Sequence, residues 1–125
     1  MTKQDFSSWS VDDLHERYAE LSMRQSAAAD LSNISGVNRL GKEIYEIASE
    51  LKSRPGRGRI LMKLFDHPDF NVHFNAGRSL MSVFPEEARR QIQAIADSGK
   101  YPYSVDAGLY LSSLDGEIAE ILRRN

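Results

Sequence analysis

The sequence of 125 residues contains no cysteine. This absence excludes disulfide bonds, thiol catalysis and thiolate metal ligands, and it fits a reducing cytoplasm. No apolar run approaches the roughly 20 residues that a membrane-spanning helix needs. The first ten residues, MTKQDFSSWS, also have no apolar stretch of the kind found in signal peptides. We therefore expect a cytoplasmic protein with no membrane anchor.

A strong positive charge is missing as well, because the formal net charge is −2. Domains that bind nucleic acid are usually strongly basic, so this balance argues against such a role for the whole chain. The charge is unevenly distributed, however. The segment KSRPGRGRILMK at 52–63 has five basic residues and no acidic residue, which leaves 11 basic against 18 acidic residues elsewhere, a net of −7. A basic segment therefore interrupts an otherwise acidic protein.

Strand-like alternation of apolar and polar residues is absent, and helical spacing dominates. Ser10 and Asp13 form a capping pair that predicts a helix over 11–30. A second helix over 35–53 is predicted from an apolar stripe with steps of three and four residues. The stripe consists of Val37, Leu40, Ile44, Ile47 and Leu51. Two heptads are too few for a convincing coiled coil, so we expect this helix to pack inside a domain.

Shorter helices are predicted after the basic segment. One lies around 60–65, a second follows Asp69 as its N-cap, a third begins at Pro85, and a fourth spans 103–114. We expect one domain over 1–125. It would comprise a helix pair at 11–53, repeat units at about 57–84 and 85–114, and a short C-terminal helical turn at 116–123.

The two repeat units rest on an internal match. Residues 65–82 and 96–113 share Ala-Gly at 76–77 and 107–108, and Leu80 matches Leu111. The offset of 31 residues lies within the period range of helical solenoids. Glycine within a helix costs about 1 kcal/mol relative to alanine. We therefore expect both Gly77 and Gly108 to have a packing reason, namely close helix approach.

The segment DHPDFNVHFNAGRSL resembles the second helix of HEAT-like repeats. Asp69, Val72, Ala76 and Leu80 fit that pattern, whereas His73 stands where arginine is usual. The stretch 34–118 is similar to an uncharacterised bacterial family of short HEAT-like domains, through the motifs VNRLGKEIYEIASELKSR, LMKLFDHPDFNV, FPEEAR and YPYSVDAGLYLSSLDGE. The resemblance implies an all-α, right-handed stack of five to seven helices formed from antiparallel helix pairs. It supplies no catalytic residues, and small domains of this type are suspected to act as immunity proteins against bacterial toxins.

Catalytic and metal-binding patterns are weak. His67 and His73 lie near two aspartates, but zinc sites usually need three or four converging ligands. The carboxylate pairs 12–13 and 86–87 fall in first helical turns, where negative charge stabilises the helix dipole. No nucleotide-binding glycine loop or nucleophile motif occurs. We predict no enzymatic activity, metal or cofactor.

Binding surfaces are the remaining candidates. The basic turn is either a solvated loop or a docking patch for an acidic partner, and the tyrosines either line the core edge or form an interface. Successive second helices would also present a groove. The candidate partner-binding residues are Arg54, Arg57, Arg59, Lys63, His73, Asn75, Arg78, Tyr101, Tyr103, Asp106 and Tyr110. We predict a protein-binding module, with a toxin-neutralising immunity protein as its most concrete form. Nucleic-acid binding through the basic segment 52–63 and a small enzyme of unknown reaction are the alternatives.

Overall fold

The computed structural model describes residues 5–124, and helices account for nearly all of their regular structure. In chain order these are α1 (Val11–Asp30), α2 (Ile34–Lys52), the 3-10 helix η1 (Arg59–Asp66), α3 (Phe70–Leu80), α4 (Pro85–Asp97) and α5 (Tyr103–Arg124). No strand occurs among the described residues. The prediction of an all-α chain with five to seven helices is confirmed. None of these helices is both long enough and apolar enough to cross a membrane.

The helices begin where the sequence carries capping residues. The side chain of Ser10 accepts a hydrogen bond from the backbone N–H of Asp13 at 3.0 Å. Asp69 similarly accepts from the N–H of Asn71 at 2.8 Å and satisfies the first turn of α3. Pro85 is the first residue of α4, where its missing N–H costs no hydrogen bond.

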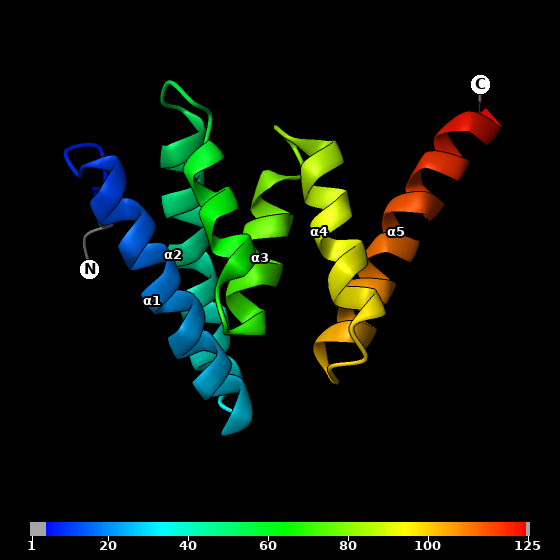
Figure 1. The fold of residues 1–125 in the computed structure, drawn as a ribbon, viewed down its shortest axis with the longest axis horizontal. Helices are drawn as coiled ribbons and strands as arrows, with labels where there is room; N and C mark the ends of the chain where they lie inside the picture. Colours follow the sequence, from blue (N-terminus) through cyan, green and yellow to red (C-terminus); the bar gives the residue numbers. More distant parts are fainter. Residues whose placement is uncertain (1–4, 125) are drawn as a thin grey trace.

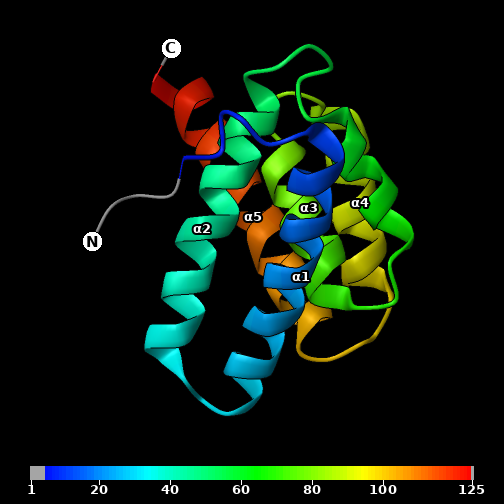
Figure 2. The same ribbon diagram turned by 90° about the vertical axis from the view of Figure 1, so that its left-hand side faces the viewer.

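Three helix pairs follow one another along the molecule: α1 with α2, η1 with α3, and α4 with α5 (Figure 1). Viewed from the α1–α2 end, α2 lies on one side of the stack, whereas α4 lies on the other (Figure 2). The chain reverses after α2 through Gly56, Arg57 and Gly58, all with positive φ. The glycines of the basic turn therefore serve a conformation that glycine adopts without strain. The HEAT-like, right-handed character of the stack remains a prediction.

Two apolar clusters hold the pairs together. The larger joins α1, α2, η1 and α3, and Tyr18, Leu21 and Ile47 are among its fully buried members. The smaller one lies between α3, α4 and α5 and contains Phe74, Ile92, Ile95, Ala107 and Leu111. Each full burial of a large aliphatic side chain contributes about 1.5–3 kcal/mol. The amphipathic stripes predicted from spacing therefore form the core that positions the surface described below.

Two sequence-based expectations were wrong. The short separate turn predicted at 116–123 is part of α5, which continues without a break to Arg124 and projects past α4 (Figure 1). The packing role predicted for Gly108 is also absent. A Cβ at Gly77 would lie 2.8 Å from Ile92 Cγ1, so that glycine lets α4 approach closely, whereas a Cβ at Gly108 would meet no atom within 4 Å. Among the described residues, no helix packs closely against α5 at Gly108, so this glycine faces open space.

Candidate functional site

Two adjoining hollows cross the molecule from α2 to α5. The first, the α2–α3 pocket, has a volume of about 360 Å³ and is lined by Gln25, Gly41, Ile44, Tyr45, Ala48, Lys52, Asn75, Arg78 and Ser79. The second, the α3–α5 groove, has a volume of about 670 Å³ and is lined by Gln25, Ser26, Ala29, Asp30, Val37, Asn71, Phe74, Arg78, Pro102, Tyr103, Asp106, Leu109 and Tyr110. Both are lined by Gln25 and Arg78. They therefore form one continuous surface contributed by α1, α2, α3, α5 and the turn before α5.

A polar network between α1 and α3 forms the floor of this surface. Asn71 donates its side-chain amide to the Ser22 carbonyl at 2.7 Å and to Gln25 Oε1 at 3.0 Å. Asn75, which is only 4% exposed, donates to Ser22 Oγ at 3.0 Å and to Gln25 Oε1 at 3.1 Å. Gln25 Nε2 in turn donates to the carbonyl of Val37 in α2 at 3.2 Å. Because buried amides need partners, this network holds α1, α2 and α3 in one arrangement.

Arg78 lies where the two hollows meet. Its guanidinium carbon is 4.5 Å from the centre of the Phe74 ring, and Nη2 donates to Asn75 Oδ1 at 2.6 Å. Within residues 5–124 it makes no other side-chain hydrogen bond and no ion pair. The Arg78 side chain is exposed. It is therefore a positioned cation with donor capacity left for a ligand.

Lys52 supplies the second positive charge of the α2–α3 pocket. Its Nζ donates to the Ser79 carbonyl at 2.9 Å and to Ser82 Oγ at 3.3 Å, so neutral oxygens hold it. Burial lowers the pKa of Lys52, because the half-buried ammonium has lost part of its hydration. No carboxylate lines this pocket. The α2–α3 pocket is thus positively charged.

Aromatic side chains of α5 form the far wall of the α3–α5 groove. The hydroxyls of Tyr103 and Ser26 are 2.9 Å apart, which links α5 to α1, and the Tyr103 ring stacks against Phe70 at 6.1 Å. Tyr110 packs edge-on against Phe74, with ring centres 6.1 Å apart. Burial raises the pKa of Tyr110. The tyrosine hydroxyl is therefore neutral near pH 7 and can both donate and accept hydrogen bonds.

The structure brings together four of the residues predicted to bind a partner: Arg78, Tyr103, Asp106 and Tyr110 all line the α3–α5 groove. Asn75 lines the adjoining α2–α3 pocket, as part of its buried floor. The remaining predicted groove and tyrosine positions lie outside both hollows. His73 stacks on Phe70 at 5.2 Å, and Tyr101 is 82% exposed, but neither lines either hollow. On α3, residue 73 points away from the side that carries 75 and 78, because successive residues are turned by about 100°.

Some residues of the predicted basic patch make contacts within the chain itself. Arg54 pairs with Glu50 at 2.9 Å, and its Nη2 donates to the carbonyls of Phe6 and Ser7 at 3.1 and 3.3 Å. Arg54 therefore holds the N-terminal segment against α2, which corrects the prediction of a free docking residue. Arg59 lies over the Phe84 ring at 4.8 Å.

Arg57 and Lys63 are both exposed. Neither makes a side-chain hydrogen bond or an ion pair within residues 5–124. Arg59 is exposed as well, so Arg57, Arg59 and Lys63 are the members of the predicted patch that remain open to solvent.

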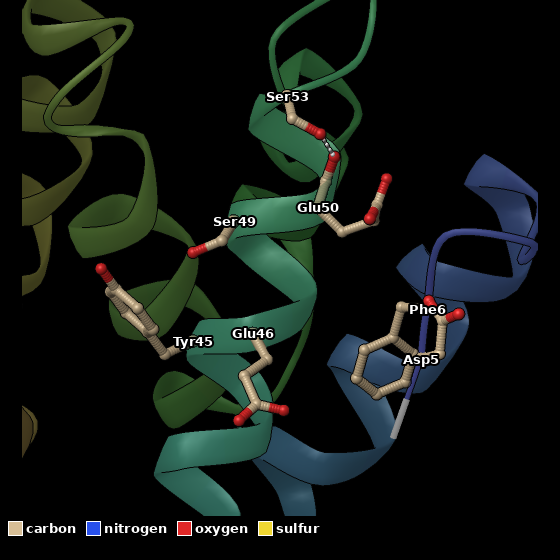
Figure 3. A pocket seen from close by; sticks show the side chains of 7 residues that line it. All are labelled: Asp5, Phe6, Tyr45, Glu46, Ser49, Glu50 and Ser53. Carbon is tan, nitrogen blue, oxygen red and sulfur yellow. Dashed lines mark hydrogen bonds between the residues drawn. The ribbon is translucent and has the colours of Figure 1, made fainter. Parts of the chain in front are cut away.

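A third hollow lies across α2, with a volume of about 520 Å³ and a lining of Asp5, Phe6, Tyr45, Glu46, Ser49, Glu50 and Ser53. Figure 3 shows Tyr45 and Ser49 pointing to one side of α2, whereas Phe6 lies on the other. Three carboxylates line it, but one of them is already paired with Arg54. Among the described residues, no three His, Cys, Asp or Glu side chains are grouped so as to hold a metal ion.

Sequence reasoning missed several polar residues of the central surface, among them Ser22, Gln25, Asn71 and Ser79, and it assigned Lys52 to the basic segment 52–63 instead. A signal was available for some of them. Asn71 and Asn75 are four residues apart on one helix, as are Ser22 and Ser26 on another, so each pair lies on one face. Polar pairs with this spacing on otherwise amphipathic helices indicate a polar contact between the helices.

Comparisons with known proteins place this surface within a family. The model of a family described as domain of unknown function DUF2019 matches residues 12–115. The chain belongs to this family. The DUF2019 match covers every residue that lines the α2–α3 pocket and the α3–α5 groove, but not the last turns of α5.

The chain is also similar to a solved structure. The protein RPA1889 from Rhodopseudomonas palustris CGA009 is 36% identical to this chain, with a TM-score of 0.86. The match covers 91% of this chain and 95% of RPA1889. A search of curated proteins found no match.

Proposed function

We propose that this DUF2019 chain is a non-enzymatic protein-binding module whose partner occupies the α2–α3 pocket and the α3–α5 groove. One observation carries the proposal: the two hollows join at Arg78 and present Tyr45, Tyr103 and Tyr110 along one continuous surface. Arginine and tyrosine are the residue types that most often dominate the energy of protein interfaces. The surface spans three helix pairs, which suits an extended segment of a partner.

The preformed floor supports binding at this place. Its asparagine amides already donate to Ser22 and Gln25 of α1, and Gln25 donates to α2. Little ordering is therefore required when a partner binds, and affinity improves when that cost is small. We also propose that the helix pairs form a HEAT-like stack, because such a stack would present α2, α3 and α5 on one face. The more specific proposal is that the chain neutralises a toxin, with the partner being a toxin whose active site this surface covers.

Nucleic-acid binding through 52–63 has less support. Lys52 and Arg54 are engaged by oxygen atoms of the chain itself, and Arg59 lies over Phe84. A duplex-binding surface needs several phosphate contacts from free basic side chains. Among the described residues, Arg57, Arg59 and Lys63 are exposed and make no side-chain hydrogen bond or ion pair, so two of the five basic side chains of this segment are already engaged.

Site-specific photo-crosslinking tests the proposal. Benzoylphenylalanine is introduced in place of Leu109, which is 64% exposed and lines the α3–α5 groove, and the protein is irradiated in extract of the source cell. The matched control carries the same group in place of Tyr101, which is exposed outside both hollows. We expect one discrete protein adduct from position 109 and none from position 101. An adduct from 101 alone, or nucleic acid as the only adduct, would refute the proposed surface.

A further inference from the structure

We propose that the α2–α3 pocket receives an acidic side chain from a peptide segment of the partner protein, with its carboxylate held by Arg78 and Lys52. The proposal rests on the proposed function and specifies the chemistry of the bound segment.

Charge complementarity supports the assignment. Both ionised side chains that line the α2–α3 pocket are cations, and no aspartate or glutamate is among its nine lining residues. Elsewhere in the described chain, arginines such as Arg17, Arg24 and Arg89 already have carboxylate partners within 3.5 Å. The pocket therefore offers two positive charges that no acidic side chain of the described chain neutralises.

The two cations are also held in place before any ligand arrives. Asn75 Oδ1 accepts from Arg78 Nη2, and the Phe74 ring supports the flat guanidinium, so Nε and Nη1 keep donors for a ligand. Lys52 has two acceptors from α3 and the turn that follows it, and its third proton remains available. Asn75 itself is more than nine-tenths buried. Hydrogen bonds between charged groups are about twice as strong as neutral ones, and preorganisation retains that strength.

The surroundings favour a carboxylate on a protein over a phosphate chain. Past Arg78, the α3–α5 groove is lined by Asp30 and Asp106, which would repel the successive phosphates of a nucleic acid. The α2–α3 pocket itself includes Ile44, Ala48 and Tyr45. A single carboxylate on an aliphatic stem, next to an apolar or aromatic residue, matches this mixture.

The test uses a display library of random 12-residue peptides, selected against the full chain. We expect the selected peptides to share an Asp or Glu and to bind at least about tenfold more weakly to Arg78→Gln. Replacing that acid by its amide in the peptide should cause a similar loss. Arg78→Lys keeps the charge but loses the planar fork, so it should recover part of the affinity. Arg90→Gln, an exposed change on α4, is the matched control and should bind like the wild type.

The outcomes separate the two proposals. Peptides that shift NMR signals of the hollows but need no acid, or that bind Arg78→Gln unchanged, would overturn the carboxylate assignment and leave the binding surface intact. Tighter binding of a peptide with phosphoserine in place of the acid would assign the pocket to phosphate instead. If no peptide binds the hollows of the folded wild type, the proposed function fails, and the carboxylate site fails with it. Circular dichroism and a melting curve for each variant exclude loss of folding as the cause.

Discussion

Replacing Gly77 and Gly108 by alanine, one at a time, should change stability in opposite directions. The two residues occupy matching positions of the internal repeat, and both lie inside helices. Alanine gains about 1 kcal/mol over glycine from helix propensity at either site. What differs is the space around the added methyl group.

At Gly77 the new Cβ would lie 2.8 Å from Ile92 Cγ1 and 3.3 Å from its Cδ1. Ile92 is fully buried, so it has little room to move. Overpacking of this kind typically costs about 1–3 kcal/mol, which exceeds the propensity gain. We expect Gly77→Ala to lower the free energy of unfolding by about 1 kcal/mol.

At Gly108 the new Cβ meets no atom within 4 Å, so only the propensity gain remains. We expect Gly108→Ala to raise the free energy of unfolding by about 0.5–1 kcal/mol. Equilibrium unfolding in urea, followed by circular dichroism, measures both changes. Stabilisation of similar size by both substitutions would refute the claim that close α3–α4 packing is the reason for Gly77. Destabilisation by Gly108→Ala would show that α5 packs against something in solution.

Three further predictions concern buried polar groups. Asn75→Ala removes the side-chain hydrogen bonds to α1 and the acceptor for the guanidinium of Arg78. The free energy of unfolding, measured in urea, should fall by about 1–3 kcal/mol. Tyr18→Phe removes a 2.7 Å hydrogen bond to Ser79 Oγ and should cost about 1 kcal/mol in the same assay; no loss would mean that water replaces the bond.

Burial lowers the pKa of both His15 and His73 below 6.5, so the folded state favours their neutral forms. The stability that depends on the two neutral histidines should therefore be fully present above about pH 6.5. It should be lost as the pH falls through their lowered folded-state pKa values. The double His15→Gln, His73→Gln variant should lose less stability between pH 7 and 5 than the wild type, and an unchanged slope would contradict this assignment.

Local chemistry explains why the helices could be predicted. Ser10, Asp69 and Pro85 act within one turn of their own positions, so the pattern of neighbours is enough to place each helix start. The buried stripe of α2, which includes Ile44, Ile47 and Leu51, follows from 3.6-residue spacing alone. The exceptions were the 3-10 geometry of η1 and the uninterrupted length of α5.

The binding surface depends on contacts between residues far apart in the chain, and these could be predicted only in part. Arg78, Tyr103, Asp106 and Tyr110 line one groove because they lie on α3 and α5, the second helices of the two predicted repeat units. Arg54 was misassigned, since its carbonyl partners lie 47 and 48 residues away in the N-terminal segment. No local pattern indicates such a partner.

The sequence by itself determined that this protein is helical, where most helices begin, and which helix faces are apolar, because each of these depends on residues within a few positions of one another. Only the tertiary structure decided which polar residues bond within the chain and which stay open to a ligand. Asn75 lies in the buried floor of the surface, Arg54 holds the N-terminal segment, and Lys52 lines a pocket with Arg78. The physical reason is that a buried polar group must find its partner in space, and here those partners lie tens of residues away.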